Sequence, residues 1–419
     1  MSWNAVLDKF IEIKKAVIET GADIWGYDKE KESCLDYWVS LLGNKEYADL
    51  IHYLELNEYE DLLLLRYANY SDILSGEEEV TLDYFWNLYD GFYKECRSVV
   101  IDIKKDCLVL VPFRKFRNLN EGDENLIENI TERIKNASCV EFSNKLDGSM
   151  QAARFYDGKV VMSGSQSLDR TQSWRLADGF RMLMEKEGYQ MMLKDHQDKT
   201  FIFEYISKRD AHLVKYDVEG LFLIGIRDVN NGKESSYAEV LELAKKYEIP
   251  ATEVYKKTLD EVVKDLDSKK SSEAEGFVLN IDGFKVKIKY NDYCGMHKIL
   301  SKISCINVII KSIADGTYHD DLEPKIPSAY IGRVKKVAEI VFDFKKYREK
   351  EIEDAYKKAP KDDKKVFMLW VDENVDKEIQ GYVRCKYLGK SFNVLKKSSG
   401  YLKLKDMGVE DYKEAVEES

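Results

Sequence analysis

The chain has 419 residues, of which 44% are hydrophobic and 34% charged, and its net charge is −12. This length suffices for two or three domains, since single cores rarely grow past about 250 residues. No apolar run approaches the roughly 20 residues that cross a bilayer, and the N-terminus has no signal-peptide pattern, so the sequence predicts a cytoplasmic multidomain protein. The Cys residues lack the spacing typical of zinc sites. The negative charge excludes uniform phosphate binding, so any contact with nucleic acid must be local.

The N-terminal segment is acidic and has helical periodicity. Apolar residues recur at three- and four-residue spacing from Trp3 to Ile18, and 35–54 behaves similarly. Residues 46–90 hold twelve acidic side chains and one basic side chain, Arg66. We expect 1–90 to form an acidic helical segment that packs on the domain that follows it.

From about Cys96 the sequence changes to short β-rich runs separated by polar or glycine-containing turns. These runs are SVVIDI, CLVLVPF, CVEFSNKL, KVVMSG, TFIFEYI, GLFLIGIRD, EGFVLNID and FKVKIKY. Residues 121–136 lie between two of them and have a helical pattern. Because strands and helices do not alternate regularly, the pattern favours an α+β domain of antiparallel sheets with flanking helices over a doubly wound fold. We place this domain at 91–300.

Beyond Tyr293 the periodicity is helical, over 302–313, 331–357 and 364–387, with a break at Pro360. This predicts an all-α domain at 301–419. Residues 381–405 carry seven basic and no acidic side chains, interleaved with aromatic residues, which suits phosphate contacts and base stacking. A solvated basic helix and loop accounts for the same composition. The basic residues are Arg384, Lys386, Lys390, Lys396, Lys397, Lys403 and Lys405.

The run FKVKIKY places three lysines, Lys285, Lys287 and Lys289, on one face of a strand and apolar residues on the other. Like charges about 7 Å apart repel each other. An anionic ligand such as a polyphosphate explains such a row of cations, whereas a solvated face on a half-exposed strand is the plain alternative.

Three further groups lie on or beside strands of the same domain. Glu204 lies in the apolar run TFIFEYI, where a carboxylate without a hydrogen-bond donor, cation or metal costs several kcal/mol. Glu275 precedes Gly276, which permits a close approach of backbone or ligand. Lys145 ends a strand run just before an Asp-Gly turn. Each feature alone has an ordinary structural explanation, but Lys145, Glu204, Glu275 and the lysine row follow one another in sequence, each on or beside a predicted strand of one domain.

The segment KLDG at 145–148 matches the KxDG signature of the covalent nucleotidyltransferases, and the later motifs follow in the order of that superfamily. More narrowly, the chain from about Tyr67 to Leu322 resembles the bacteriophage T4 RNA ligase 1 family. The resemblance lies in ECRSVVID, FRKFRNLNE, KLDGS, FIFEYI, EGFVLNIDGFKVKIKYNDYCGMH and ADGTYHDDL. It implies an ATP-dependent RNA ligase that joins 5′-phosphate and 3′-hydroxyl ends through a lysyl-AMP and an RNA-adenylate.

The resemblance also implies roles for individual residues. Lys145 is the expected nucleophile toward ATP, and we expect Lys287 and Lys289 to lower its pKa and to neutralise the phosphates. The expected nucleotide-binding residues are Arg97, Lys115, Lys145, Gly148, Glu204, Lys287 and Lys289. The expected Mg²⁺ ligands are Glu275, Glu204 and Asp320. The expected setting is RNA repair in the cytoplasm of a bacterial or phage-infected cell, with nicked tRNA as the candidate substrate.

The chain departs from the family pattern in three respects, one of which is an N-terminal segment longer than the match requires. The family usually has KFFN where this chain has KFRN at 115–118. The basic residue that the family has before a Gly-Ser falls near Ser165, where this chain has none. Its candidate replacements are Arg154, Lys159 and Arg170.

Three alternatives stay open at this stage: a DNA ligase, a GTP-dependent capping enzyme, and a non-catalytic RNA-binding homologue. The first two usually carry a β-rich OB domain after the last lysine motif, where this chain becomes helical. The third alternative is disfavoured because mutational drift in an inactive homologue would have removed at least one of the five motif residues, and all five are present. They are Lys145, Glu204, Glu275, Lys287 and Lys289. The sequence has no GxxxxGK loop, so we expect a separate kinase or phosphatase to prepare the RNA ends.

Overall fold

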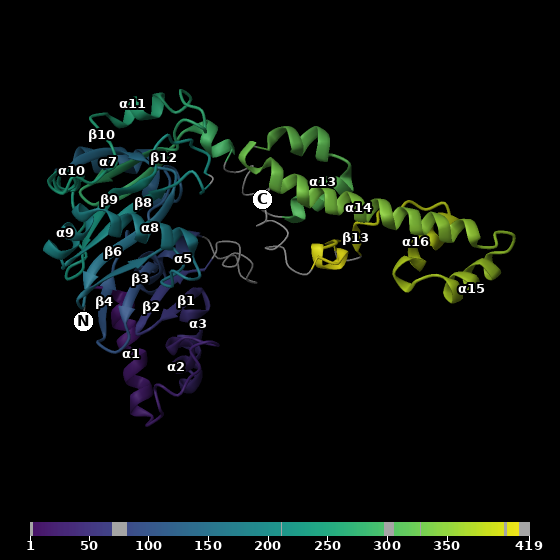
Figure 1. The fold of residues 1–419 in the computed structure, drawn as a ribbon, viewed down its shortest axis with the longest axis horizontal. Coiled ribbons are helices and arrows are strands. Elements are labelled where there is room, and N and C mark those ends of the chain that lie inside the picture. The colour runs from purple at the N-terminus through teal and green to yellow at the C-terminus, as the bar shows by residue number, and fades with distance from the viewer. Residues whose placement is uncertain are drawn as a thin grey trace. The chain divides into compact units, whose positions relative to one another are not determined.

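The structure is a computed structural model that describes residues 3–68, 82–210, 212–296, 306–326, 328–397 and 400–409. It contains two compact units, residues 1–293 and 294–419, each of which is described by itself (Figure 1). The boundary that the sequence analysis expected after residue 300 lies outside the described residues.

The N-terminal segment is not purely helical, contrary to expectation. Helices α1 (Ala5–Glu19), α2 (Cys34–Leu42) and α3 (Lys45–His52) lie beside a four-stranded antiparallel sheet (Figure 1). Its order is β1 (Leu54–Tyr59), β2 (Leu62–Tyr67), β3 (Arg97–Asp102) and β4 (Cys107–Leu110). Because an apolar run such as LLLLRY is buried on both faces, its periodicity does not identify it as a strand. The short helices α5 (Leu82–Asn87), η1 (Leu88–Gly91) and α6 (Phe92–Glu95) lead into β3.

Two further antiparallel sheets confirm the expected α+β class. One has the order β7 (Lys159–Ser163), β6 (Ser149–Tyr156), β8 (Lys199–Ile206), β9 (Gly220–Asp228). The other has the order β10 (Val254–Tyr255), β5 (Val140–Lys145), β11 (Gly276–Ile281), β12 (Phe284–Lys289). All eight expected runs form strands, and β6 and β10 are additional. The flanking helices are η2 (Asp123–Asn125), α7 (Ile127–Lys135), α8 (Trp174–Glu185), α9 (Glu187–Asp195), α10 (Tyr237–Lys246) and α11 (Leu259–Lys264).

Burial follows the strand periodicity, because each sheet turns one face to a core. Phe201 and Phe203 on β8 pack in one cluster, and Phe142, Val286 and Ile288 pack in another. The apolar face of β12 therefore points into the core, which leaves its lysines on the other face, as the sequence predicts.

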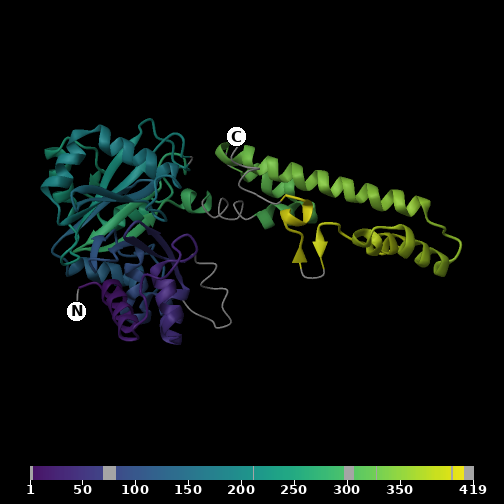
Figure 2. The same ribbon diagram turned by 60° about the horizontal axis from the view of Figure 1, so that its bottom comes forward.

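The second unit is mainly helical, as expected. The long helix α14 (Ser328–Lys358) packs against α13 (Ile306–Asp315) and α16 (Lys377–Tyr387), and α15 (Lys364–Asn374) packs on α16 (Figure 2). Helix α14 ends just before Pro360. The remaining elements are η3 (Tyr318–Leu322), η4 (Glu323–Lys325), η5 (Leu404–Met407) and the short pair β13 (Lys396–Lys397) and β14 (Gly400–Tyr401).

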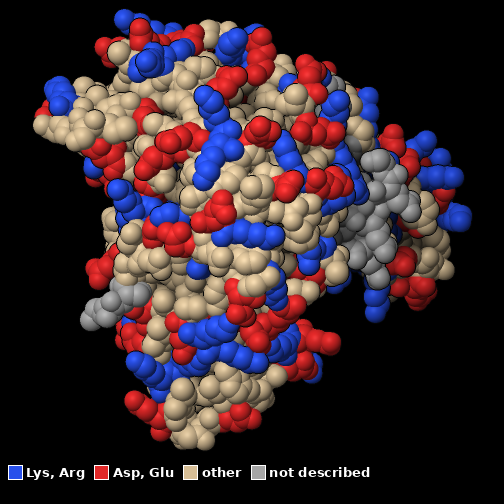
Figure 3. All heavy atoms as spheres, turned by 60° about the vertical axis from the view of Figure 1, so that its left-hand side comes forward, with Lys and Arg blue, Asp and Glu red and all other residues tan. Residues whose placement is uncertain are grey.

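Charged side chains of both signs are interspersed over the face shown in Figure 3. Among the helices of the described segments, none is long and apolar enough to cross a membrane.

Candidate active site

The register of three strands brings the predicted motifs together. Gly276 on β11 is the cross-strand partner of Lys145 on β5 and of Lys289 on β12. Glu275 directly precedes this point, so its side chain lies between the two lysines. Gly276 has a φ of 149°, and a Cβ there would lie 2.1 Å from the carbonyl oxygen of Ile288. Only glycine permits this close approach.

Glu275 pairs with both lysines. Its Oε2 lies 2.6 Å from Nζ of Lys145, its Oε1 lies 2.8 Å from Nζ of Lys289, and the residue is 3% exposed. Burial favours a lower pKa for Lys145, but the carboxylates of Glu275 and Glu204 outweigh it and raise that pKa. The expectation that neighbouring cations lower the pKa of Lys145 is therefore wrong for this structure, because Glu275 lies between the cations and offsets their charge.

Glu204 has the hydrogen-bond donor that its apolar strand requires. The backbone N–H of Gly148 donates to its Oε1 at 3.0 Å. A Cβ on Gly148 would lie 2.4 Å from the carbonyl oxygen of Tyr205, so the turn passes β8 too closely for a side chain. Burial raises the pKa of Glu204 to about 7, and Lys145 opposes this shift.

Lys287 is the lysine whose pKa falls. Burial lowers its pKa well below the usual value, and the nearby charges of Arg97, Lys115, Lys145 and Lys289 lower it further. In the part of the chain that the structure describes, no carboxylate forms an ion pair with Lys287; its Nζ lies 4.8 Å from the centre of the Phe116 ring. A charge in this position is stabilised by a bound anion.

A pocket of about 130 Å³ is formed by these groups, and we call it the Lys145 pocket. Nη1 of Arg97 is buried and has no hydrogen-bond partner among the described residues. The apolar part of the lining includes Phe113, Leu146 and Val278, and it offers an apolar surface to a planar ring such as a nucleobase. The lining contains five of the predicted residues, namely Arg97, Lys145, Glu204, Lys287 and Lys289.

Four predicted residues are not part of this lining: Glu275 and Gly148, which bond to Lys145 and Glu204 of the lining, and Lys115 and Asp320. Nζ of Lys115 donates to the hydroxyl oxygen of Tyr67 at 3.2 Å and lies 5.0 Å from the centre of the Trp86 ring. Asp320 lies on η3 in the second unit with an exposed side chain, and its role in metal binding stays a prediction.

The donor set for a metal is small. Within the described segments, no three His, Cys, Asp or Glu side chains gather closely enough to hold a metal ion. Glu275 and Glu204 nevertheless fit Mg²⁺, because this ion commonly binds one or two carboxylates and completes its shell with water and substrate phosphates.

A supporting cluster behind the Asp-Gly turn was not anticipated from the sequence. Asp147 accepts hydrogen bonds from the backbone N–H of Val214 at 3.0 Å and from the hydroxyl of Tyr293 at 2.8 Å. His212 lies between Asp147 and Asp210, at 3.5 and 3.0 Å. Burial favours a lower pKa for His212, but these two carboxylates raise it to about 10. The only sequence signal was the polar run KRDAH after β8.

None of the three candidate replacements for the missing basic residue lines the Lys145 pocket. Nε of Arg154 donates to the carbonyl oxygen of Gln197 at 2.5 Å, and Lys159 pairs with Glu60 at 2.6 Å. Arg170 lies over the ring of Phe180 at 3.9 Å. These contacts give all three residues structural tasks.

The basic segment of the second unit is largely paired within that unit. Arg384 pairs with Asp372, Lys386 with Glu353, Lys396 with Asp315 and Lys397 with Asp406. Tyr387 stacks on Phe367 with ring centres 4.0 Å apart. These contacts favour the alternative of a solvated, internally neutralised surface for at least this part of the segment.

Comparison with known proteins agrees with the geometry. Residues 95–293 match the family model described as RNA ligase. This segment, which is just under half of the chain, is therefore similar to the RNA ligases that the model describes. Every residue that lines the Lys145 pocket falls within the matched segment.

No curated protein matches the sequence. Among solved structures, the chain is similar to Naegleria gruberi RNA ligase with PPi, with 20% identity and a TM-score of 0.36, over 44% of this chain and 57% of that one. A mutant of the same ligase with ATP and Mn gives 20% identity and a TM-score of 0.37, over 45% and 58%. The chain thus spans little more than half the length of these relatives.

Proposed function

We propose that the chain is an ATP-dependent RNA ligase that carries AMP on Lys145. The observation that supports this most directly is the arrangement of Lys145 and Lys289 on the two oxygens of Glu275, beside Glu204 and Lys287. A lysine next to cations that bind phosphate and next to carboxylates is suited to nucleophilic attack on a nucleotide.

In the first step, the neutral amine of Lys145 attacks the α-phosphorus of ATP. An N–P bond forms, the bond from the α-phosphorus to the pyrophosphate oxygen breaks, and pyrophosphate leaves. Lys287 and Arg97 offset the charge of the phosphates. The pKa of Lys145 is raised by Glu275, so its amine is protonated in this structure and must lose the proton before attack. This loss requires that the carboxylate of Glu275 pairs with another cation instead of Lys145.

Mg²⁺ would be held by Glu275 and Glu204, and when bound it supplies positive charge at the phosphate oxygens. In the second step, AMP passes from Lys145 to the 5′-phosphate of an RNA. In the third, a 3′-hydroxyl attacks that phosphate and AMP leaves. RNA repair in the cytoplasm, nicked tRNA as substrate, substrate selection by the second unit and a separate end-healing enzyme are parts of the same proposal.

Mass spectrometry after exposure to ATP and Mg²⁺ tests the nucleophile. We expect an AMP adduct on the wild type and none on Lys145→Arg, a variant that keeps the positive charge beside Glu275 and therefore the fold. Lys135→Arg, on the exposed surface of α7, is the matched control and should form the adduct. An adduct on Lys145→Arg would refute the assignment.

The same assay with GTP in place of ATP distinguishes an ATP-dependent RNA ligase from a GTP-dependent capping enzyme. Sealing of a 5′-phosphorylated RNA, compared with nicked duplex DNA, distinguishes the DNA ligase. Labelling by GTP alone, or sealing of DNA alone, would contradict the proposed function.

A further inference from the structure

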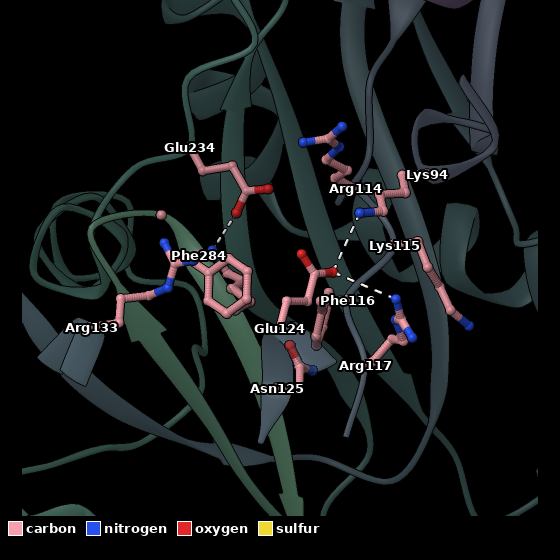
Figure 4. A pocket seen from close by; sticks show the side chains of 12 residues that line it. Lys94, Arg114, Lys115, Phe116, Arg117, Glu124, Asn125, Arg133, Glu234 and Phe284 are labelled. Carbon is pink, nitrogen blue, oxygen red and sulfur yellow. Dashed lines mark hydrogen bonds and ion pairs between the residues drawn. The ribbon is translucent and has the colours of Figure 1, made fainter. Parts of the chain in front are cut away.

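A second pocket, of about 360 Å³, shares Phe116 with the Lys145 pocket (Figure 4). We call it the basic pocket, because six cationic side chains and two carboxylates line it. Its cations are Lys94, Arg114, Lys115, Arg117, Arg133 and Lys285. One of them, Arg117, is the residue at which the chain departs from the KFFN pattern.

Glu124 neutralises two of these cations. Its Oε1 lies 3.3 Å from Nζ of Lys94 and 3.7 Å from Nη2 of Arg117, and Figure 4 shows its carboxylate between them. Arg117 is 4% exposed, whereas Glu124 is 42% exposed on the short element η2. The carboxylate of Glu124 can therefore turn to solvent while the buried guanidinium of Arg117 stays in place. An incoming anion can then take the position of the Glu124 carboxylate.

Of the remaining cations, Arg114 pairs with Glu95, which lies outside the pocket lining. Lys285 pairs with Glu234, the other carboxylate. The guanidinium of Arg133 lies over the ring of Phe284 at 4.1 Å, and no carboxylate in the described segments pairs with it. An exposed guanidinium on an aromatic ring is a surface suited to a phosphate and an adjacent base.

The basic pocket and the Lys145 pocket share Phe116 and are both lined by lysines of β12, Lys285 in the first and Lys287 and Lys289 in the second. Lys285, Lys287 and Lys289 share one face of this strand, and four residues of a strand span about 13 Å. The reacting phosphorus lies at the Lys289 end, because Lys289 and Lys145 share Glu275. The two outer phosphates of ATP extend over less than this span, whereas a nucleic-acid strand carries a phosphate at every residue.

We propose that the basic pocket binds a backbone phosphate of the RNA strand whose end is joined at Lys145. This inference rests on the proposed function and adds to it the path of the RNA. Arg117 and Lys94 hold the phosphate in place of Glu124, and Arg133 with Phe284 forms the outer wall.

Binding of a fluorescein-labelled single-stranded RNA of about ten nucleotides to the full chain, without ATP, tests the proposal by anisotropy. Glu124→Gln should bind the RNA about fivefold more tightly, the factor of one charge pair at about 4 Å in water. Glu128→Gln removes the same charge from an exposed position on α7 and should change affinity less. A gain in affinity cannot result from misfolding.

Arg133→Gln should weaken binding by a similar factor and make the slope of log K against log salt shallower by about 0.7, the value for one lost contact with a single strand. Lys135→Gln lies two residues along the same helix, outside the pocket lining, and should keep the wild-type slope. Arg117→Lys should retain more affinity than Arg117→Met.

Two results would overturn the proposal. One is RNA binding by Glu124→Gln and Arg133→Gln that equals the binding of their controls. The other is that the two variants bind RNA like the wild type and differ from it only in the ATP concentration that half-saturates adduct formation. That result would assign the basic pocket to the nucleotide. Because RNA binding is measured without ATP, failure of Lys145 to form an adduct contradicts the proposed function separately.

Discussion

Glu204 provides a quantitative test of the site, because its pKa ties the charge of the pocket to the stability of the fold. Burial raises this pKa from 4.5 to about 7. A carboxyl with a raised pKa in the folded state favours folding below the unfolded pKa, and this contribution is lost as the pH rises through the folded pKa. At about 1.4 kcal/mol per pKa unit, the loss between pH 4.5 and pH 7 is about 3 kcal/mol.

Glu204→Gln removes this titration while keeping the hydrogen-bond acceptor for the N–H of Gly148. Denaturation of wild type and variant from about pH 5 to about pH 8 should show the variant gaining relative stability with pH, by up to about 3 kcal/mol. In thermal scans this difference is roughly 5 °C for the first unit. Glu128→Gln, on the exposed surface of α7, should follow the wild type. If the free energy of unfolding of Glu204→Gln and of the wild type changed with pH in parallel, the raised pKa of Glu204 would be refuted.

Two further predictions concern the turn that follows Lys145. Gly148→Ala should slow adduct formation by roughly 100-fold, because its Cβ would lie 2.4 Å from a carbonyl oxygen and displace the turn. The control Gly381→Ala on α16, where a Cβ meets nothing within 4 Å, should leave the rate unchanged. Equal rates for the two variants would contradict the close approach at Gly148. His212 should titrate near pH 10 in NMR spectra, so its contribution to stability is present below pH 6.5 and lost toward pH 10. Asp210→Asn should lower the pKa of His212; an unchanged titration would contradict the pairing.

The sequence predicted the parts of the site that depend on strand periodicity and motif order. The shared face of Lys285, Lys287 and Lys289 follows from the two-residue repeat of a strand. The need of Glu204 for a donor follows from its apolar neighbours. The N–H of Gly148 as that donor does not follow from the sequence, because it depends on the pairing of β6 with β8.

The rest depends on contacts between distant segments. The pairing of one residue, Gly276, with both Lys145 and Lys289 puts Glu275 between two ammonium groups, and it reverses the expected shift in the pKa of Lys145. Lys115 lies beside Tyr67 because both backbones bond to the segment before β3: the N–H of Lys115 donates to the carbonyl oxygen of Lys94 and that of Tyr67 to the carbonyl oxygen of Cys96. A sequence motif carries no information about such contacts.

The proposed phosphate sites place locally clustered cations in a chain whose net charge is −12. Clustered cations repel each other unless a counter-charge is near, so a folded site that awaits phosphates needs carboxylates in their place. Glu275 does this for Lys145 and Lys289, and Glu124 does it for Lys94 and Arg117. The difference in burial assigns different behaviour to the two. Glu275, at 3% exposure, must stay and exchange its lysines for another cation, whereas the exposed Glu124 can leave its partners to the phosphate.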